Sequence, residues 1–244
     1  MEKLEADIVI VGTGASGLFA ALHVPNDKKV LMLTKSDVEN SDSFLAQGGI
    51  CVLRDKNDFD SFMEDTMKAG HYENRKESVE IMINSSRDII NELIGYGVDF
   101  ATKDGELDYT REGAHSKPRI LFHEDITGKE ITSTLLDVVR KLENVTIMEY
   151  VTMTDIIEKD NVCYGVLAKD ANNNEMSIEA GYTIFACGGI GGLYDHSTNY
   201  PHLTGDAIAI AIQHGIKLEN VDYVQIHPTT LYTKKKGRAF LLSD

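Results

Sequence analysis

The chain has 244 residues, of which 39 are acidic and 24 are basic, so its formal net charge at pH 7 is −15. This charge disfavours nucleic acid and anionic lipid as partners, while an apolar fraction of 42% suffices for a sizeable core and excludes a disordered chain. The three cysteines are too few and too far apart for a disulfide framework or a zinc motif, so we expect no metal site and a reducing, cytoplasmic location.

The first 35 residues predict a β-turn-α-β unit. Charged residues run directly up to an apolar, β-branched segment at residues 7–11, which is typical of a buried parallel strand and not of a signal peptide. Residues 15–23 have a helical composition, and residues 30–33 form a second short strand. No apolar segment approaches the roughly 20 residues of a membrane-spanning helix, so we expect no membrane span.

The middle of the chain predicts helices around an irregular segment. Apolar residues at three- and four-residue spacing indicate amphipathic helices at residues 59–69 and 78–94. Residues 98–122 look irregular, with a turn at Asp104 and Gly105. A third helix is expected at residues 129–142.

The second half predicts a run of strands followed by a helix at residues 205–215. The expected strands are residues 145–150, 154–158, 162–168, 176–179 and 183–187, with a turn at residues 171–174. Strands that alternate with helices and then follow one another favour an α/β fold. We therefore predict a Rossmann-like domain with a central parallel sheet and a smaller antiparallel layer.

Three glycines form the motif GTGASG between the first strand and the first helix: Gly12, Gly14 and Gly17. In a dinucleotide site the first glycine permits a tight turn, the second lets a pyrophosphate approach the backbone, and the third lets the helix pack against the sheet. An acidic ribose ligand is expected at the end of the second strand, but Thr34 and Lys35 stand there, which disfavours a plain NAD site. Lys35 is either a solvated surface lysine or a nucleotide contact.

Seven motifs follow one another along the chain: GTGASG, NSDSFLAQGGI, TREGAHSKPRIL, TGKE, ACGGIGG, TGDAIAIA and QIHPTTLY. Together they resemble the L-aspartate oxidase family, within the fumarate reductase and succinate dehydrogenase flavoprotein superfamily, over essentially the whole chain. The resemblance implies an FAD-binding domain. By match to the family's motifs, the flavin contacts would be Gly12, Thr13, Gly14, Ala15, Ser16, Gly17, Lys35, Asp42, Ser43, Phe44, Leu45, Ala46, Gln47, Gly48, Gly49, Val151, Ala186, Gly188 and Asp206.

The neighbourhood of residues 40–43 distinguishes branches of that superfamily. Membrane-bound members carry a histidine there that is covalently joined to FAD, whereas this chain has Asn40, Ser41, Asp42 and Ser43. The resemblance therefore implies non-covalent FAD in a soluble oxidase. Asp206 also has a simpler interpretation, because an acid in the first turn of a helix stabilises that helix.

Residues 110–130 hold six basic or histidine side chains and four carboxylates. The resemblance implies that Glu112 orients the amino group of the substrate and that His227, in QIHPTTLY, hydrogen-bonds a substrate carboxylate. L-aspartate carries one ammonium, so its site needs an acceptor that a dicarboxylate such as succinate would leave unpaired. A solvated charged loop is the favoured interpretation of four neighbouring side chains, namely Arg111, His115, Lys117 and Arg119. The remaining histidines, His202 among them, are expected to be ordinary surface or core residues.

The reaction implied by the resemblance is the oxidation of L-aspartate to iminoaspartate, the first step of NAD biosynthesis, by hydride transfer from Cα to the flavin. Oxygen or fumarate would reoxidise the flavin, and quinolinate synthase would receive the product. Residues 1–220 would form the FAD-binding domain and residues 221–244 the start of a capping domain. Family members continue into R-G-E-G, whose arginine is the proposed catalytic base, so we expect an N-terminal fragment that is truncated within the cap and inactive alone.

Two other functions fit the same motifs. One is a soluble fumarate reductase or succinate-oxidising flavoprotein, which activity on succinate rather than aspartate would distinguish. The other is a non-catalytic FAD-binding module that acts in sensing or interaction, which would retain flavin without turnover.

Overall fold

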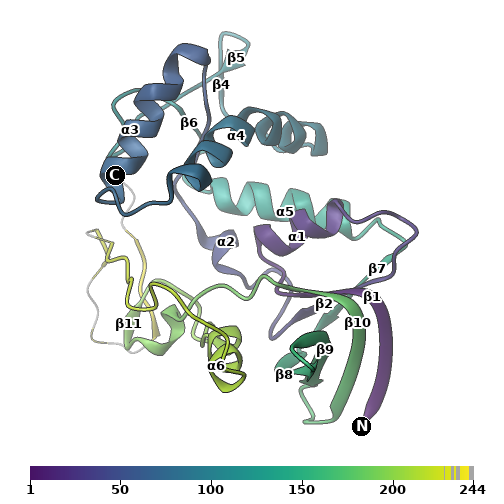
Figure 1. The fold of residues 1–244 in the computed structure, drawn as a ribbon. Coiled ribbons are helices and arrows are strands. Elements are labelled where there is room, and N and C mark those ends of the chain that lie inside the picture. Colours follow the sequence, from purple (N-terminus) through teal and green to yellow (C-terminus); the bar gives the residue numbers. More distant parts are fainter. Residues whose placement is uncertain (228, 232–233, 235–236, 242–244) are drawn as a thin grey trace. The chain divides into compact units, whose positions relative to one another are not determined.

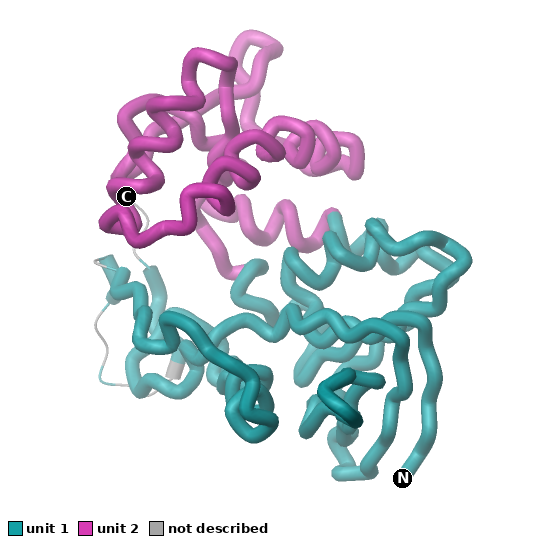
Figure 2. Tube along the Cα trace, viewed as in Figure 1, with its two compact units in different colours: residues 1–44, 135–244 teal, residues 45–134 magenta. Residues whose placement is uncertain are grey.

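The computed structural model describes residues 1–227, 229–231, 234 and 237–241 (Figure 1). The chain divides into two compact units (Figure 2). Unit 1 comprises Met1–Phe44 and Leu135–Asp244, and unit 2 comprises Leu45–Thr134. The predicted boundary between residues 1–220 and 221–244 separates an FAD-binding domain from a capping domain, whereas the two units are defined by compactness. The predicted boundary therefore stays a prediction.

A six-stranded sheet forms the centre of unit 1, with the strand order β7-β2-β1-β10-β9-β8. The first four strands run parallel, and β9 and β8 continue the same sheet in antiparallel pairing. The bounds are β1 Glu2–Val11, β2 Val30–Thr34, β7 Val145–Glu149, β8 Thr152–Lys159, β9 Val162–Lys169 and β10 Glu175–Phe185. The predicted α/β fold with a central parallel sheet is confirmed.

The core of unit 1 lies on this sheet. All five residues of β2 are buried, as expected for a parallel strand that is covered on both faces. Val9 on β1 and Ile178 on β10 are fully buried in the same apolar cluster. Helix α1 (Ala15–Leu22) follows β1, and α6 (Asp206–Gln213) contributes Ile210 to the cluster.

Two strand predictions differ from the structure. Residues 176–179 and 183–187 were expected as separate strands, but β10 is continuous because it pairs with β1 from Glu2 to Val11. The same pairing starts β1 at Glu2 instead of residue 7, so ladder hydrogen bonds extend the strand through charged residues. Two shorter elements complete unit 1: η2 (Gly191–Leu193), and a parallel pair of β11 (His196–Ser197) with β12 (Gly237–Arg238).

Unit 2 is built mainly on two helices. Helix α3 (Phe59–Ala69) has the predicted bounds, and α4 (Lys76–Tyr96) ends at Gly97, whose φ of +106° closes the helix in the left-handed conformation. Phe62, Val79 and Ile83 form a small buried core between these helices.

The rest of unit 2 is short elements and loops. Strand β3 (Ile50–Cys51) pairs with β6 (Ile120–Leu121), β4 (Thr102–Lys103) pairs with β5 (Glu106–Leu107) across the predicted turn, and η1 (Lys56–Asp58) precedes α3. Helices α2 (Asp42–Leu45) and α5 (Thr127–Val139) each contain a unit boundary. Helix α2 is a single turn in the NSDSFLAQGGI segment, which the sequence predicted as a loop.

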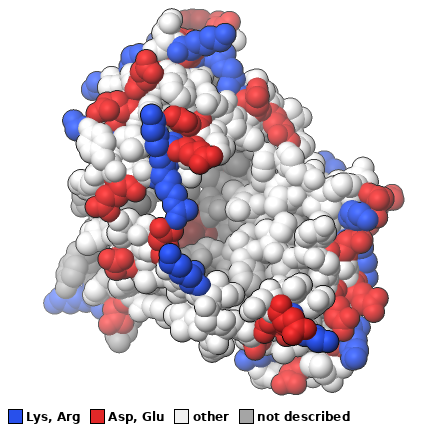
Figure 3. Space-filling model, viewed as in Figure 1, with Lys and Arg blue, Asp and Glu red and all other residues white. Residues whose placement is uncertain are grey.

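Among the described residues, no helix is both long and apolar enough to cross a bilayer. Acidic and basic side chains are interspersed over the face drawn in Figure 3.

Candidate functional site

The glycine turn after β1 is too tightly packed for side chains at two positions. Gly12 has a φ of +118°, and a Cβ there would lie 2.1 Å from the carbonyl oxygen of Ala186. A Cβ on Gly17 would lie 2.1 Å from the carbonyl oxygen of Gly12. Strand, turn and helix therefore meet backbone to backbone, as the motif predicts for its first and third glycines.

Gly14 lies at the start of α1 and is tight for a different reason. Its φ of −71° suits any residue, and a Cβ would lie 3.0 Å from the Oγ of Ser43 and 3.8 Å from the Cβ atoms of Ser41 and Ser43. Ser43 Oγ accepts a hydrogen bond from the N–H of Ala15 at 3.1 Å, which satisfies one donor of the first helical turn. Thr13 is buried and donates its hydroxyl to the carbonyl of Val38 at 3.2 Å.

A cavity of about 130 Å³ opens at the carboxyl ends of β1, β2 and β10, where ligands bind in open parallel sheets. Ten of the predicted flavin contacts line it: Gly12, Thr13, Gly14, Lys35, Asp42, Ser43, Val151, Ala186, Gly188 and Asp206. Ala15, Ser16 and Gly17 form the first turn of α1, and Phe44 and Leu45 end α2. The sequence motifs thus converge on one cavity within unit 1.

Lys35, which follows β2 directly, contacts the TGDAIAIA motif in this cavity. Its Nζ lies 2.9 Å from Asp206 Oδ2 and donates to Thr204 Oγ1 at 2.9 Å. Thr204 in turn donates to the other carboxylate oxygen of Asp206 at 2.6 Å. The Lys35 side chain is 25% exposed and is paired, so it is not freely solvated, and its contact with a nucleotide stays a prediction.

Sequence reasoning missed several residues of the cavity wall. Apolar surface comes from Leu33, Met153 and Leu203, and Cys187 and His202 lie beside them. Burial, and next the charge of Asp206, raise the pKa of the Cys187 thiol to about 11, so it is neutral at physiological pH. Burial and the nearby Lys35 lower the pKa of His202. Cys187 lies within the ACGGIGG motif and His202 lies two residues before the TGD motif, and these positions were the available signal.

Unit 2 brings a predicted flavin loop and a predicted substrate residue together. Glu112 Oε1 accepts a hydrogen bond from the N–H of Gly49 at 3.4 Å, across 63 residues of sequence. A Cβ added to Gly48 would lie 3.6 Å from Glu112 Oε2. The loop that holds Gln47 is fixed at its ends, because Gly128 N–H donates to the carbonyl of Ala46 and β3 follows Gly49 directly. An exposed carboxylate therefore lies beside the glycines of this loop.

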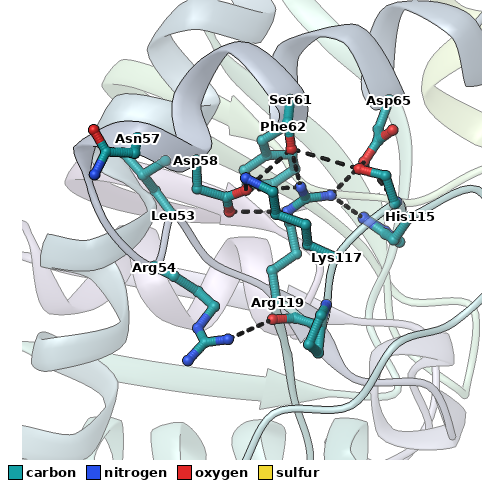
Figure 4. Close-up of polar contacts among 12 residues, drawn as sticks. Leu53, Arg54, Asn57, Asp58, Ser61, Phe62, Asp65, His115, Lys117 and Arg119 are labelled. Carbon is teal, nitrogen blue, oxygen red and sulfur yellow. Dashed lines mark hydrogen bonds and ion pairs between the residues drawn. The ribbon is translucent and has the colours of Figure 1, made fainter.

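Arg119 is not part of a solvated loop, so that prediction is wrong. Its side chain is fully buried and lies over the ring of Phe62 at 4.9 Å. Two nitrogens of the guanidinium bind Asp58, at 3.0 and 2.9 Å, and a third binds Asp65 at 2.5 Å. Ser61 accepts another hydrogen bond at 2.7 Å. Figure 4 shows this group of side chains around the guanidinium.

Two residues near Arg119 in the sequence bind the same two carboxylates, Asp65 on α3 and Asp58 in the turn before it. Ser116 donates its N–H and hydroxyl to Asp65, and Lys117 lies 3.3 Å from Asp58. Burial alone would raise the pKa of Asp65, but these hydrogen bonds and Arg119 lower it to about 2. Arg111 is exposed, as expected of a charged loop residue.

His227 lies in unit 1, with an exposed side chain. Its Nδ1 accepts a hydrogen bond from the N–H of Thr229 at 3.3 Å. The predicted contact of His227 with a substrate carboxylate stays a prediction.

Comparison with known proteins agrees with the motifs. The family model described as FAD binding domain matches residues 7–244. The chain is 44% identical to the L-aspartate oxidase of Clostridium perfringens over 243 residues, which cover 99% of this chain and 55% of that protein. It is 44% identical to the L-aspartate oxidase of Clostridium acetobutylicum, with 99% and 56% covered. The chain thus spans about half the length of these relatives.

Solved structures with a similar fold include two respiratory flavoproteins. Mycobacterium smegmatis Sdh1 superimposes with a TM-score of 0.80 at 28% identity, over 87% of this chain and 39% of that one. The FrdA chain of E. coli quinol fumarate reductase superimposes with a TM-score of 0.83 at 25% identity, over 88% and 38%. A flavocytochrome c3 fumarate reductase, at 23% identity and a TM-score of 0.85, shares the fold.

Proposed function

Because this chain belongs to the FAD binding domain family and has FAD as its cofactor, we propose that it forms part of an oxidase that converts L-aspartate to iminoaspartate. Its similarity to L-aspartate oxidases supports this substrate. The observation that carries the proposal is the position of Glu112, whose carboxylate lies beside Gly48 and Gly49. The resemblance that assigns Glu112 to the substrate also assigns those glycines to the flavin.

The residues around the unit 1 cavity fit part of an FAD molecule. Gly14 leaves the N-terminus of α1 open toward the cavity, where a helix favours a negative phosphate. Leu33, Val151 and Met153 offer apolar surface to a planar ring, and the Lys35–Asp206 pair offers polar partners for hydroxyls. At about 130 Å³ the cavity is below the roughly 300–1,000 Å³ of whole-ligand pockets, so it would take one portion of the dinucleotide.

FAD, when bound, supplies the two-electron acceptor that oxidation of an amino acid requires. Glu112 would accept hydrogen bonds from the substrate ammonium and so orient the Cα–N bond. His227 would donate to one substrate carboxylate. A carboxylate paired with an ammonium selects L-aspartate over succinate, because succinate offers Glu112 no cationic donor in place of that ammonium. We further propose that FAD is held without a covalent bond, since residues 40–43 contain no histidine.

The wider setting follows from the same proposal. Oxygen or fumarate would accept the electrons, and quinolinate synthase would use the iminoaspartate in NAD biosynthesis, in the cytoplasm. Residues 1–220 would belong to the FAD-binding domain and residues 221–244 to the beginning of a capping domain. Because the curated relatives are about twice as long, the remaining part of the site, including a catalytic arginine, would lie in the segment that corresponds to their second half.

The test is a comparison of Glu112→Gln with the unaltered protein, expressed from the entire gene and loaded with FAD. We expect KM for L-aspartate to rise about tenfold or more, since a hydrogen bond between charged groups contributes about 1.5–3 kcal/mol. Activity with succinate or fumarate should change less than about twofold. Equal losses with aspartate and succinate would refute the role of Glu112, and a protein that oxidises only succinate would be a succinate-oxidising relative instead.

A further inference from the structure

Glu112 belongs to a loop that is closed at its base. Thr110 and Ile120 exchange both backbone hydrogen bonds, at 2.9 and 3.2 Å. Within the loop, the N–H of His115 donates to the carbonyl of Glu112 at 3.3 Å, which makes a tight turn. Ala114, inside that turn, has a φ of +67°, a left-handed conformation that non-glycine residues rarely adopt. The turn therefore persists only because contacts outside it hold His115 in place.

Arg119 contacts His115, and Arg119 is held in turn by one face of α3 and by the turn before it. Asp58, Ser61, Phe62 and Asp65 are spaced three and four residues apart, so they share a face of the helix and its first turn. All four contact Arg119 (Figure 4). With Asp58 and Asp65 already bound on two sides, the guanidinium is fixed, and one of its nitrogens lies 3.2 Å from Nδ1 of His115.

This contact defines the protonation state of His115. A guanidinium can only donate, so Nδ1 must accept, and the ring proton lies on Nε2. Nε2 faces the Sγ of Cys51 at 3.4 Å. Cys51 is two residues after Gly49, whose N–H holds Glu112. The result is a closed circuit of contacts that runs from Glu112 to Gly49, through Cys51 to His115, and back to Glu112.

The charges around His115 favour the same state. It faces Arg119 and Glu112 from its own loop, Asp58 and Asp65 from α3 and its preceding turn, and Cys51 from β3. Burial, and next Arg119, lower the pKa of His115, although the three carboxylates oppose them. Burial, and next Glu112, raise the pKa of the Cys51 thiol. The contact between His115 and Cys51 therefore joins a neutral imidazole to a neutral thiol and is not an ion pair.

We propose that His115 and Arg119 are positioning residues for Glu112. Arg119 fixes His115 as the Nε2–H tautomer, and His115 fixes the turn that presents the Glu112 carboxylate to the N–H of Gly49. The catalytic consequence rests on the proposed function, in which Glu112 binds the substrate ammonium.

A double-mutant cycle tests this in the full-length, FAD-loaded protein, with His115→Leu, Glu112→Gln and both together. His115→Leu should raise KM for L-aspartate about tenfold and change kcat less than about threefold. In the Glu112→Gln background it should add less than about twofold, because both changes disable the same contact. In His115→Asn the amide oxygen can replace Nδ1 as the acceptor for Arg119, so most of the lost affinity should return. Fully additive effects, or no rescue by asparagine, would overturn the proposal.

A second readout separates this proposal from the function of Glu112. Amide hydrogen exchange at Gly49 reports directly on whether Glu112 still accepts its hydrogen bond. We expect exchange at Gly49 to accelerate about tenfold in His115→Leu and to stay near the original rate in His115→Asn. Unchanged exchange in His115→Leu refutes positioning, whatever the kinetics show. Accelerated exchange, combined with a Glu112→Gln variant of normal KM for L-aspartate, supports positioning but refutes the proposed substrate contact.

Discussion

Unit 1 and unit 2 hold their candidate site residues by different means. In unit 1 the cavity is formed by backbone at the ends of parallel strands, and two glycines are needed because carbonyl groups leave no room for a Cβ. In unit 2 the site residue Glu112 sits on an irregular loop that is held by side-chain contacts to α3. A backbone-built site depends on local sequence, whereas a side-chain-built site depends on residues far apart in the chain.

The largest expected effect is in unit 2, at Arg119. Replacing Arg119 by leucine removes the side chain that binds both Asp58 and Asp65, and leaves the buried Asp58 and the half-buried Asp65 without that cation. Breaking a buried ion pair in this way typically costs about 3–5 kcal/mol. Urea denaturation should show that loss for Arg119→Leu, while Arg111→Leu, a change at an exposed arginine of the same loop, should stay within about 0.5 kcal/mol. Similar stabilities for the two variants would contradict a side-chain-built unit 2.

A slightly smaller effect is expected in unit 1, at Gly12. Alanine there combines a left-handed φ with a Cβ placed 2.1 Å from the Ala186 carbonyl oxygen, so Gly12→Ala should lose about 3 kcal/mol and its FAD affinity. Gly189→Ala is the matched control, because a Cβ there meets nothing within 4 Å and its φ lies outside the left-handed region. Thermal unfolding and flavin absorbance check both variants. Should Gly12→Ala behave like Gly189→Ala, the backbone-built account of unit 1 is wrong.

The smallest effect is a pH dependence specific to unit 2. The pKa of Asp65 falls from 3.8 in the unfolded chain to about 2 in the fold. Its stabilising contribution is therefore complete above about pH 4 and is lost as the pH drops through 2, because the unfolded chain binds the proton first. Stability measured between pH 5 and pH 2 should decline less steeply in Asp65→Asn than in the unaltered protein. Parallel declines would show that Asp65 is not held by Arg119 and Ser116.

The same contrast explains what the sequence could predict. The parallel sheet, α3 and the glycine turn follow from local signals, namely runs of β-branched residues, helical spacing and the GTGASG motif. The continuity of β10 was missed because Gly181 reads as a break, although pairing along the whole of β1 overrides it. Tertiary pairing of this kind leaves no mark within the segment itself.

The burial of Arg119 was missed for a similar reason. Asp58 lies 61 residues earlier in the chain, in the turn before α3, and Asp65 lies 54 residues earlier, on α3. Charged side chains are almost always exposed, so composition favours the wrong answer for the one that is buried. The motif match did identify Glu112 and the loop at Gly48 and Gly49, but the contact between them required the fold.

One measurement tests most directly whether FAD is held at the glycine turn of unit 1: titration of the full-length protein and its Gly14→Val variant with FAD. The variant should keep its fold, because Gly14 has a φ of −71° and the nearest atom to an added Cβ is the end of the Ser43 side chain, at 3.0 Å. We predict saturable binding of one FAD by the unaltered protein, and binding weakened at least about a hundredfold in Gly14→Val at an unchanged melting temperature. Equal FAD affinity in the two folded proteins would contradict the account.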